Sequence, residues 1–407
     1  MTKQNEKDAK RVPELRFKGF ADAWEQRKLG DLGSVQMNKR IFKDQTSESG
    51  EVPFFKIGTF GKKPDSFISK KLFDEYKSKY PYPKVGDILI SASGSIGRTV
   101  FYKGEDAYFQ DSNIVWLEHD GRLKNSFLEQ FLKRTKWNKI EGSTIKRLYN
   151  KDILNKKINL PKLKEQEKIG QLFQSLDKTI TLHEEKHRQL EQLKKALLQK
   201  MFADETGYPL LRFKGFTITW QQRKLGDLAS FSKGSGYSKM DLTSEGIPVI
   251  LYGRLYTGYE TIIKSIDTFS QKKKSSVYST GRDVIVPASG ETAEDIARAS
   301  VVSKKGVALG SDLNIITPTK NIDPTFLALS ISNGTPHKEM AKRAQGKSIV
   351  HLHNADLVQI MLKYPSLREQ KKVSQQFEKL DALITLHQHK IDNLKLLKRA
   401  LLQKMFV

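Results

Sequence analysis

The chain contains the same segment twice. Residues 15–32 are LRFKGFADAWEQRKLGDL and residues 211–228 are LRFKGFTITWQQRKLGDL, with fourteen of eighteen positions identical. A second matched pair covers residues 160–202 and 364–406: Pro161 corresponds to Pro365, Gln166 to Gln370, and LLQKMF closes both. Repetition on this scale predicts two copies of one module, each of roughly 200 residues.

The stretches between the matched ends, residues 33–159 and 229–363, are called here the first and second body. They retain only short similarities, which pair GDILISASG with RDVIVPASG, the DSNIVWL that starts at Asp111 with the DLNIITP that starts at Asp312, and GSTIKRLYNKDI with GKSIVHLHNADL. The bodies are therefore expected to share a fold and to differ in most surface residues. One fold with two different sets of surface residues suggests two related but different tasks.

Short β-branched runs bounded by Gly, Ser, Asp and Pro predict strands in both bodies, among them DILIS, TVFY, NIVWL, DVIVP, ASVV and NIIT. NSFLEQFLKRTKWNKI and PTFLALSISN have the spacing of helices. Each body is thus predicted to be a mixed α/β domain.

The segments that follow the bodies carry apolar residues in steps of four and three, which is the seam of a coiled coil. A single chain with two such helices most simply pairs them with each other, and the body between them favours an antiparallel arrangement. Leu193, Leu198, Leu397 and Leu402 are expected to widen the apolar stripes, and Ser366 with Glu369 to form a capping box. The predicted seam residues are Phe173, Leu176, Ile180, Leu190, Leu197, Phe377, Leu380, Ile384, Leu394 and Leu401.

The predicted organisation is a polar tail, two bodies with their leading segments, and two spacer helices. The tail is expected at residues 1–14, the two bodies with their leading segments at 15–161 and 207–365, and the two spacer helices at 162–206 and 366–407. The first eleven residues lack the apolar core of a secretory signal, and no run of 18 apolar residues predicts a transmembrane helix.

The formal net charge of +25 favours a polyanionic partner, most often nucleic acid. The absence of cysteine excludes disulfides and thiolate metal sites. The Gly-rich loop SGSIG, followed by Arg98, could approach phosphates, although such a loop is also an ordinary tight turn. Lysine and arginine clusters could do the same, or could simply be solvated. The candidate DNA-binding residues are Lys39, Arg40, Lys62, Lys63, Ser93, Ser95, Arg98, Lys146, Arg147, Lys233, Tyr237, Arg254, Lys272, Lys273 and Lys274.

Residues 183–187 match the zinc-protease pattern H-E-x-x-H. The corresponding residues 387–391 lose the Glu and the second His, and both His183 and His187 fall on the predicted seam. A structural role in the seam is therefore preferred to a metalloprotease, and no metal or catalytic residue is assigned. The chain also lacks D/N-P-P-Y/F and F-x-G-x-G, the motifs of adenine methylation and S-adenosylmethionine binding, and the hydrolase motif G-x-S-x-G.

Two divergent bodies alternate with two matched helical segments, and each helix is preceded by a proline and an EQ pair, in LPKLKEQEKIG and YPSLREQKKVS. Together with WEQRKLGDL and WQQRKLGDL, this order resembles the specificity (S) subunit of type I restriction–modification systems over essentially the whole chain. The resemblance implies two target recognition domains of α/β (α+β) class, each for one half of a split, asymmetric duplex DNA site. It also implies that the paired helices form an antiparallel coiled coil that acts as a ruler.

The same resemblance implies a cytoplasmic, non-catalytic recognition subunit that docks two modification methyltransferase subunits and works with restriction subunits. S-adenosylmethionine, ATP and Mg²⁺ would then be bound by those partners, with no cofactor on this chain. Two alternatives remain: a helical scaffold that does not read DNA sequence, and the metalloprotease. The sequence does not determine the half-sites or the gap between them.

Overall fold

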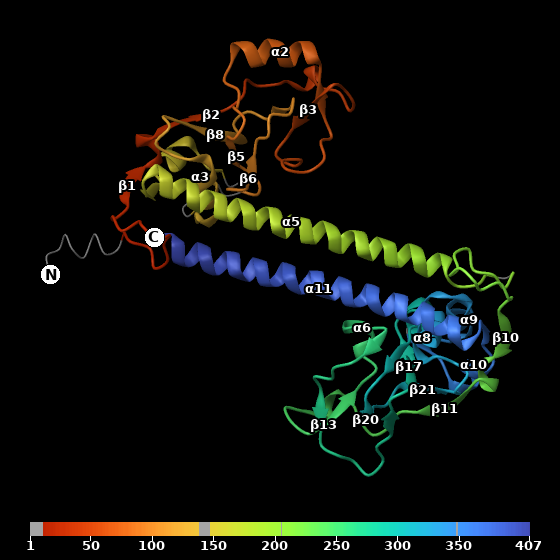
Figure 1. The fold of residues 1–407 in the computed structure, drawn as a ribbon. Helices are drawn as coiled ribbons and strands as arrows, with labels where there is room; N and C mark the ends of the chain where they lie inside the picture. The colour runs from red at the N-terminus through yellow and green to blue at the C-terminus, as the bar shows by residue number, and fades with distance from the viewer. Residues whose placement is uncertain (1–10, 138–146, 205, 347–348) are drawn as a thin grey trace, which may run out of the picture. The chain divides into compact units, whose positions relative to one another are not determined.

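The fold is described from a computed structural model for residues 11–137, 147–204, 206–346 and 349–407. The chain forms two compact units (Figure 1). Unit 1 comprises residues 1–184 and 389–407, and unit 2 comprises residues 185–388. Each unit therefore holds one body, the first part of the helix that follows it, and a part of the other long helix.

Unit 1 is built around a four-stranded antiparallel sheet in the order β2-β8-β5-β6, with Leu89 of β5 opposite Trp116 of β8 and Val100 of β6. A three-stranded sheet has the order β4-β3-β7, and β1 pairs with β9. The strands are β1 Glu25–Lys28, β2 Gly33–Gln36, β3 Val52–Phe55, β4 Phe67–Ile68, β5 Ile88–Ser91, β6 Thr99–Phe101, β7 Tyr108–Phe109, β8 Ile114–His119 and β9 Lys157–Leu160. The helices of this body are α2 Lys70–Lys79, α3 Asn125–Arg134 and α4 Asn150–Leu154.

Unit 2 contains two five-stranded sheets, in the orders β11-β21-β17-β19-β14 and β12-β15-β13-β20-β16, and the pairs β10-β23 and β18-β22. The strands are β10 Gln221–Lys224, β11 Ala229–Lys233, β12 Leu242–Thr243, β13 Ile247–Ile250, β14 Ile262–Ile263, β15 Phe269–Ser270, β16 Tyr278–Thr280, β17 Asp283–Pro287, β18 Ser289–Gly290, β19 Ser300–Val302, β20 Lys305–Leu309, β21 Leu313–Pro318, β22 Val350–His351 and β23 Met361–Tyr364. The helices are α6 Arg254–Thr257, α7 Ala293–Ile296, α8 Pro324–Asn333, α9 Thr335–Arg343 and α10 Asn354–Val358.

The strands predicted from β-branched runs are confirmed as β5, β6, β8, β17, β19 and β21. Helix α8 has the predicted bounds, with Asp323 as its N-cap. The predicted helix over residues 125–140 is too long: α3 ends at Arg134, because Thr135 adopts an extended backbone. The mixed α/β class of both bodies is confirmed.

The repeated segments join each body to its long helix through one small sheet. In unit 1, Glu25 of β1 lies opposite Leu160 of β9. In unit 2, Gln221 of β10 lies opposite Tyr364 of β23. Both strand pairs are antiparallel and have the same register in the two repeats. This agreement explains why the WxQRKL sequence is retained: it positions the body at the base of the helix.

The long helices are α5 Leu163–Lys200 and α11 Leu367–Met405. Within unit 1, Asp177 of α5 forms an ion pair with Lys398 of α11. Within unit 2, Lys194 of α5 pairs with Asp381 of α11 at 2.5 Å. In unit 1, Glu184 lies after Asp177 and pairs with Lys395, which lies before Lys398. In unit 2, Phe202 lies after Lys194 and contacts Phe377, which lies before Asp381. The predicted antiparallel coiled coil is therefore confirmed in each unit.

All ten predicted seam residues are buried or half-buried. Leu176 and Leu401 pack against the core of unit 1, and Leu197 packs with Leu380 in the core of unit 2. Two expectations about the stripes are wrong, since Leu193 and Leu397 are 46% and 47% exposed, whereas Leu198 and Leu402 do pack against the cores. Leu193 and Leu397 each directly precede a lysine that pairs with the other helix, Lys194 and Lys398, and so lie beside the face that meets that helix.

Each long helix ends inside a body core. The ring of Phe406, just after α11, stacks on Phe127 at 5.1 Å and meets Trp24 edge to face at 6.0 Å. Phe202, just after α5, lies 5.7 Å from Phe326 in unit 2. The repeated LLQKMF ending therefore supplies core residues to the body at which each helix ends.

No helix among the described residues combines the length and the apolar content needed to cross a membrane.

Candidate nucleic-acid interface

A Gly-rich loop follows the central strand β5 of unit 1. Gly94 and Gly97 have φ of 62° and 78°, in the left-handed region that favours glycine. Gly97 also lies against Trp137, and a Cβ there would come within 2.2 Å of the indole nitrogen. The amide of Arg98 donates to the Ser91 hydroxyl at 2.9 Å. The loop is thus a tightly closed turn, which is the ordinary structural reading of SGSIG.

The same loop forms a clamp with two distant parts of the chain. The Ser93 hydroxyl donates to Asn113 Oδ1 at 2.7 Å, and the backbone of Ala92 bonds to Asn113 and to Leu148 at 2.7 Å each. Ser93 also pairs with Arg147 as an antiparallel bridge. We call this arrangement the loop clamp.

Unit 2 contains an equivalent loop clamp. The Ser289 hydroxyl donates to Asp312 Oδ2 at 3.0 Å, the backbone of Ala288 bonds to Asp312 at 2.8 Å and to Leu352 at 3.0 Å, and Ser289 pairs with His351. Asp312 therefore corresponds to Asn113. The sequence comparison that matched Asp111 with Asp312 is wrong at this point, because the connection before β21 differs in length.

Several candidate DNA-binding residues of unit 1 belong to its loop clamp or contact residues next to it. Arg40 faces Asp111 at 3.4 Å, Arg147 Nη2 donates to Ser112 O at 3.2 Å, and Arg98 Nη2 donates to Gly61 O at 3.3 Å, next to Lys62 and Lys63. Lys39 lies over the Tyr80 ring at 5.1 Å. Ser95, Lys62 and Lys63 are exposed, whereas Ser93 is buried within the clamp. Lys146 lies outside the described residues.

The candidates of unit 2 are less uniform. Lys233 is exposed at the end of β11, where it pairs with Asn314 beside the clamp. Lys272 and Lys274 are exposed, but Lys273 Nζ bonds to Asp241 at 2.5 Å and to Gly236 O at 2.6 Å. Two further candidates have internal roles: Tyr237 is 1% exposed with its hydroxyl against Ser276, and Arg254 forms ion pairs with Glu260 and Asp267. DNA contact by the candidate residues of both units stays a prediction.

Among the groups of unit 2 with a shifted pKa, Asp241 and Tyr256 lie beside candidate or clamp residues. The ion pair with Lys273 and the hydrogen bonds from Ser238 lower the pKa of Asp241 to about 2. Burial raises the pKa of Tyr256 to about 12, and its hydroxyl donates to Ser289 O at 2.9 Å. Asp241 is therefore charged and neutralises Lys273, while Tyr256 remains a neutral donor that supports the clamp.

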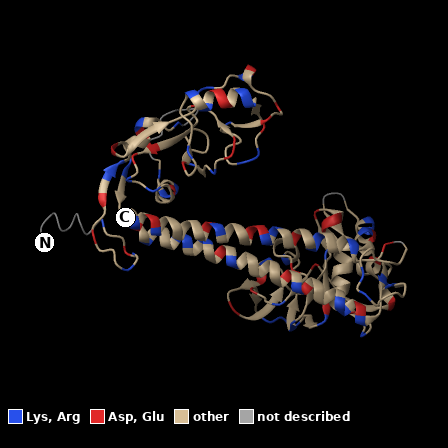
Figure 2. Ribbon diagram, turned by 45° about the horizontal axis from the view of Figure 1, so that its top comes forward, with Lys and Arg blue, Asp and Glu red and all other residues tan. Residues whose placement is uncertain are grey.

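Charge alone does not mark an interface in either unit. Figure 2 shows lysine, arginine, aspartate and glutamate interleaved along both long helices and over the bodies. The position of the loop clamps, rather than the density of charge, is what singles out the candidate surface.

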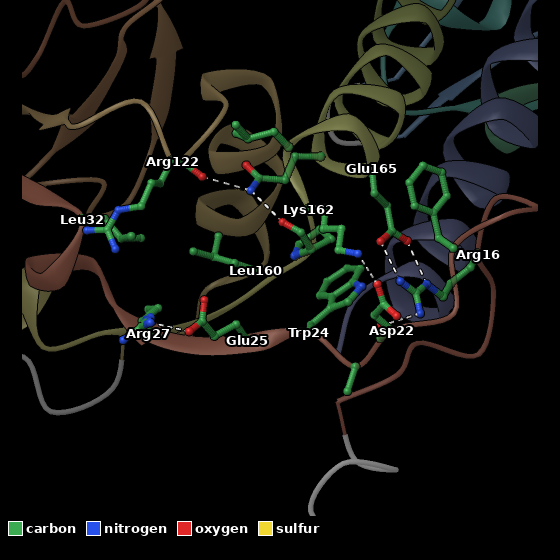
Figure 3. A pocket seen from close by; sticks show the side chains of 15 residues that line it. Arg16, Asp22, Trp24, Glu25, Arg27, Leu32, Arg122, Leu160, Lys162 and Glu165 are labelled. Carbon is green, nitrogen blue, oxygen red and sulfur yellow. Dashed lines mark hydrogen bonds and ion pairs between the residues drawn. The ribbon is translucent and has the colours of Figure 1, made fainter.

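The sequence did not reveal the joint between each body and its helix. Arg16 Nε and Nη2 donate to the two carboxylate oxygens of Glu165 at 2.8 and 2.7 Å, beside a cavity of about 340 Å³ that Trp24 and Lys162 help to line (Figure 3). The hydrogen bond to Glu165 raises the pKa of Arg16.

Gln166 completes this joint. Its amide donates to Pro161 O and Arg122 O, and its oxygen accepts from Lys124 N at 2.8 Å. In unit 2, Gln370 makes the corresponding bonds with Pro365, Asn321 and Asp323.

Arg212 and Glu369 repeat the Arg16–Glu165 pair in unit 2, with both distances at 2.7 Å. The predicted capping box is therefore only half correct: the Ser366 hydroxyl accepts from Glu369 N at 3.4 Å, but the Glu369 carboxylate accepts from Arg212. The signal for this joint was the recurrence of EQ and of LRFKGF.

The H-E-x-x-H residues have other contacts. Glu184 pairs with Lys395 at 2.6 Å, and His187 Nδ1 lies 3.5 Å from Glu191. Within the described residues, no three His, Asp or Glu side chains gather in a way that could hold a metal ion.

Comparison with known proteins agrees with this architecture. The family model for the type I restriction modification DNA specificity domain matches residues 21–192 and 217–396. A putative type I restriction enzyme specificity subunit of Haemophilus influenzae is 58% identical over 157 residues, which are 38% of this chain and only 41% of that relative. A putative specificity subunit of Methanocaldococcus jannaschii is 22% identical over 93% of this chain and 92% of its own.

Among solved structures, the S subunit of a type I restriction–modification system from M. genitalium has the same fold. Its TM-score is 0.66 at 16% identity, and the match covers 97% of this chain and 99% of the other. The family model alone spans most of the sequence and falls once on each repeat. The chain therefore belongs to the family of type I restriction–modification DNA specificity subunits.

Proposed function

We propose that each body reads one half of a bipartite, asymmetric duplex DNA site. The observation that carries this proposal is the loop clamp, which has the same backbone bonds in both units but different side chains around it. A constant backbone with variable side chains suits two readers of different sequences. Phosphate contacts would supply much of the affinity and groove contacts the discrimination.

The paired long helices would set the gap between the half-sites. The 38 residues of α5 correspond to about 57 Å at about 1.5 Å per residue. Half-sites on one face of B-DNA lie about 34 Å apart, or a multiple of that distance. A helix pair of this length is therefore of the right order to relate two half-sites.

The helices would also dock two modification methyltransferase subunits. Leucines that the seam does not bury recur at corresponding positions: Leu182 and Leu386 are 66% and 47% exposed, and Leu193 and Leu397 are 46% and 47% exposed. Exposed apolar side chains mark protein contacts where they belong to a contiguous apolar surface, and on this proposal each pair of leucines belongs to such a surface. Because they occur once per repeat, they would take two copies of the same partner.

On this proposal the chain contributes recognition and no catalysis. The methyltransferase subunits would bind S-adenosylmethionine and methylate adenine, and restriction subunits would use ATP and Mg²⁺. The complex would act on DNA in the cytoplasm.

The test is to express the chain with its methyltransferase partner in cells that lack other modification systems and to sequence the methylated adenines. The proposal predicts one motif with two specified halves and a fixed gap, which disappears when this chain is omitted. A scaffold without sequence reading would give methylation with no bipartite motif, and duplex binding that does not depend on sequence.

A further inference from the structure

The segment that closes each loop clamp has one backbone and two sets of side chains. In unit 1 it consists of Arg147, Leu148 and Tyr149. In unit 2, His351, Leu352 and His353 take the same places, as the bridges Ser93–Arg147 and Ser289–His351 establish. The next residues agree as well: Tyr149 N donates to Asp152 and His353 N to Asp356, both at 3.0 Å.

The central leucine faces the core and its neighbours face outward. Leu148 and Leu352 are 4% and 0% exposed. Side chains alternate along an extended segment, so residues 147 and 149 leave on the other side, as do 351 and 353. Tyr149 is 42% exposed, His351 and His353 are exposed, and Arg147 is half-buried.

The clamp itself does not need these side chains. It is held by backbone bonds and by the Ser93 and Ser289 hydroxyls, and it forms equally with arginine or histidine beside it. Arg147 Nη2 donates to Ser112 O at 3.2 Å, which orients the guanidinium beside the clamp. In unit 2 the His351 and His353 rings lie parallel, 6.5 Å apart with an interplanar angle of 4°.

We infer that residues 147 and 351 are corresponding base-reading positions, and that Arg147 recognises a guanine in the half-site of the first body. Arginine bonds bidentately to guanine O6 and N7 in the major groove, which is the commonest specific contact between proteins and DNA. Histidine cannot make that fork, so the second body would accept a different base at its equivalent position. This inference rests on the proposed reading of one half-site by each body.

The experiment uses the complete complex of this chain with its methyltransferase partner, and DNA duplexes in which each half-site is randomised in turn. Arg147→Ala and Arg147→Lys are compared with the unaltered complex, and His351→Arg is the reciprocal change. Lys62→Ala is the control, because Lys62 is an exposed cation near the same loop and is expected to contact phosphate at most. Thermal melting of each variant verifies that it is folded.

Arg147→Ala should reduce the preference for guanine at one position of one half-site about tenfold or more, and leave the other half-site unchanged. Arg147→Lys should recover part of that preference. His351→Arg should create a guanine preference in the other half-site. Lys62→Ala should weaken the binding of all DNA sequences equally. It should also lower the salt dependence of the binding constant by the equivalent of about one phosphate contact.

The inference is overturned if the Arg147 variants fold and keep the full preference, or if they weaken all sequences equally. A separate arm exchanges residues 33–148 for those of a relative with another specificity. If that exchange alters one half-site while Arg147→Ala does not, only the assignment of the reading position fails. If the unaltered complex prefers no sequence, the proposed function fails along with the inference.

Discussion

Arg16 and Glu165, 149 residues apart in the chain, form a doubly hydrogen-bonded ion pair at the base of α5. The Glu165 side chain is 1% exposed and that of Arg16 10% exposed. Arg212 and Glu369 form the same pair at the base of α11. One joint, built twice, thus ties each repeated segment to the long helix of its own repeat.

Replacing Arg16 by Ala should destabilise unit 1 by about 3–5 kcal/mol, because it leaves the buried Glu165 carboxylate without a partner. The hydrogen bond with Glu165 raises the pKa of Arg16, so the pair's contribution is present below the usual arginine pKa and is lost only in strong alkali. Hydrogen exchange along the chain would measure the change and show whether it is confined to unit 1.

Arg27→Ala, which removes an exposed pair with Glu25, should change stability by less than about 1 kcal/mol. Equal effects of the two substitutions would contradict this role of the joint.

Phe406→Ala should destabilise unit 1 by about 3–5 kcal/mol, although the residue follows the helix of the second repeat. Its ring packs on Phe127 and Trp24, and its removal leaves a cavity among them. Phe202→Ala should have the equivalent effect on unit 2, where the ring packs near Phe326 and Phe377. Local hydrogen exchange distinguishes the two outcomes. If Phe406→Ala loosened only unit 2, the described end of α11 would be wrong.

Leu190→Asp should lower the free energy of unfolding by several kcal/mol. Leu190 is 7% exposed in the seam of unit 2, so the carboxylate of the new aspartate would be buried without a partner. Leu193→Asp, three residues along the same helix, is the matched control. Leu193 is 46% exposed, so its substitution should change the melting temperature little. A similar loss of stability in both variants would place the seam on a different face of α5.

The coupling energy between Asp177 and Lys398 should be larger than that between Glu184 and Lys395. The first pair has side chains 34% and 16% exposed and recurs in unit 2 as Asp381 with Lys194. The second is 46% and 50% exposed and has no counterpart in the other repeat. Double-mutant cycles should give about 1 kcal/mol for the first pair and about 0–0.5 kcal/mol for the second. The reverse order would remove the Asp177–Lys398 pair as a determinant of helix register.

Much of this architecture could be predicted because the repeat carries it. The duplicated segments reveal two modules. The spacing of apolar residues from Phe173 to Leu197, and again from Phe377 to Leu401, predicts the helix pair. The β-branched runs locate the central strands. These signals are local or periodic, and one chain is enough to detect them.

Other features depend on contacts that no local pattern encodes. The pairing of Arg16 with Glu165 joins residues far apart in sequence, and the burial of Phe406 in the first body requires the fold of the whole unit. The match of Asp111 with Asp312 failed because a comparison of similar strings aligns identical residues, here two aspartates. In the fold, Asn113 and Asp312 are equivalent. Among the candidate DNA contacts, Tyr237 and Arg254 could not be told from free surface residues until their partners Ser276 and Glu260 were known.

The exposed leucines give a direct test of partner docking. Leu182→Ser and Leu386→Ser together should prevent assembly with the methyltransferase subunit while leaving the melting temperature nearly unchanged, because both side chains are mostly outside the seam. Each single substitution should leave one of the two copies bound. Mass measurement of the assembled complex counts the copies. Two bound copies in the double variant would rule out these leucines as the docking surface.

The central claim is that one body reads one half-site, and exchange of a body tests it most directly. Residues 33–148, which make up most of the first body, are replaced by the corresponding residues of a relative with another specificity. The methylated adenines of cells that carry the hybrid are then sequenced. The account predicts a motif in which one half changes, the other half is retained and the gap stays the same. A motif in which both halves change, or neither does, would contradict it.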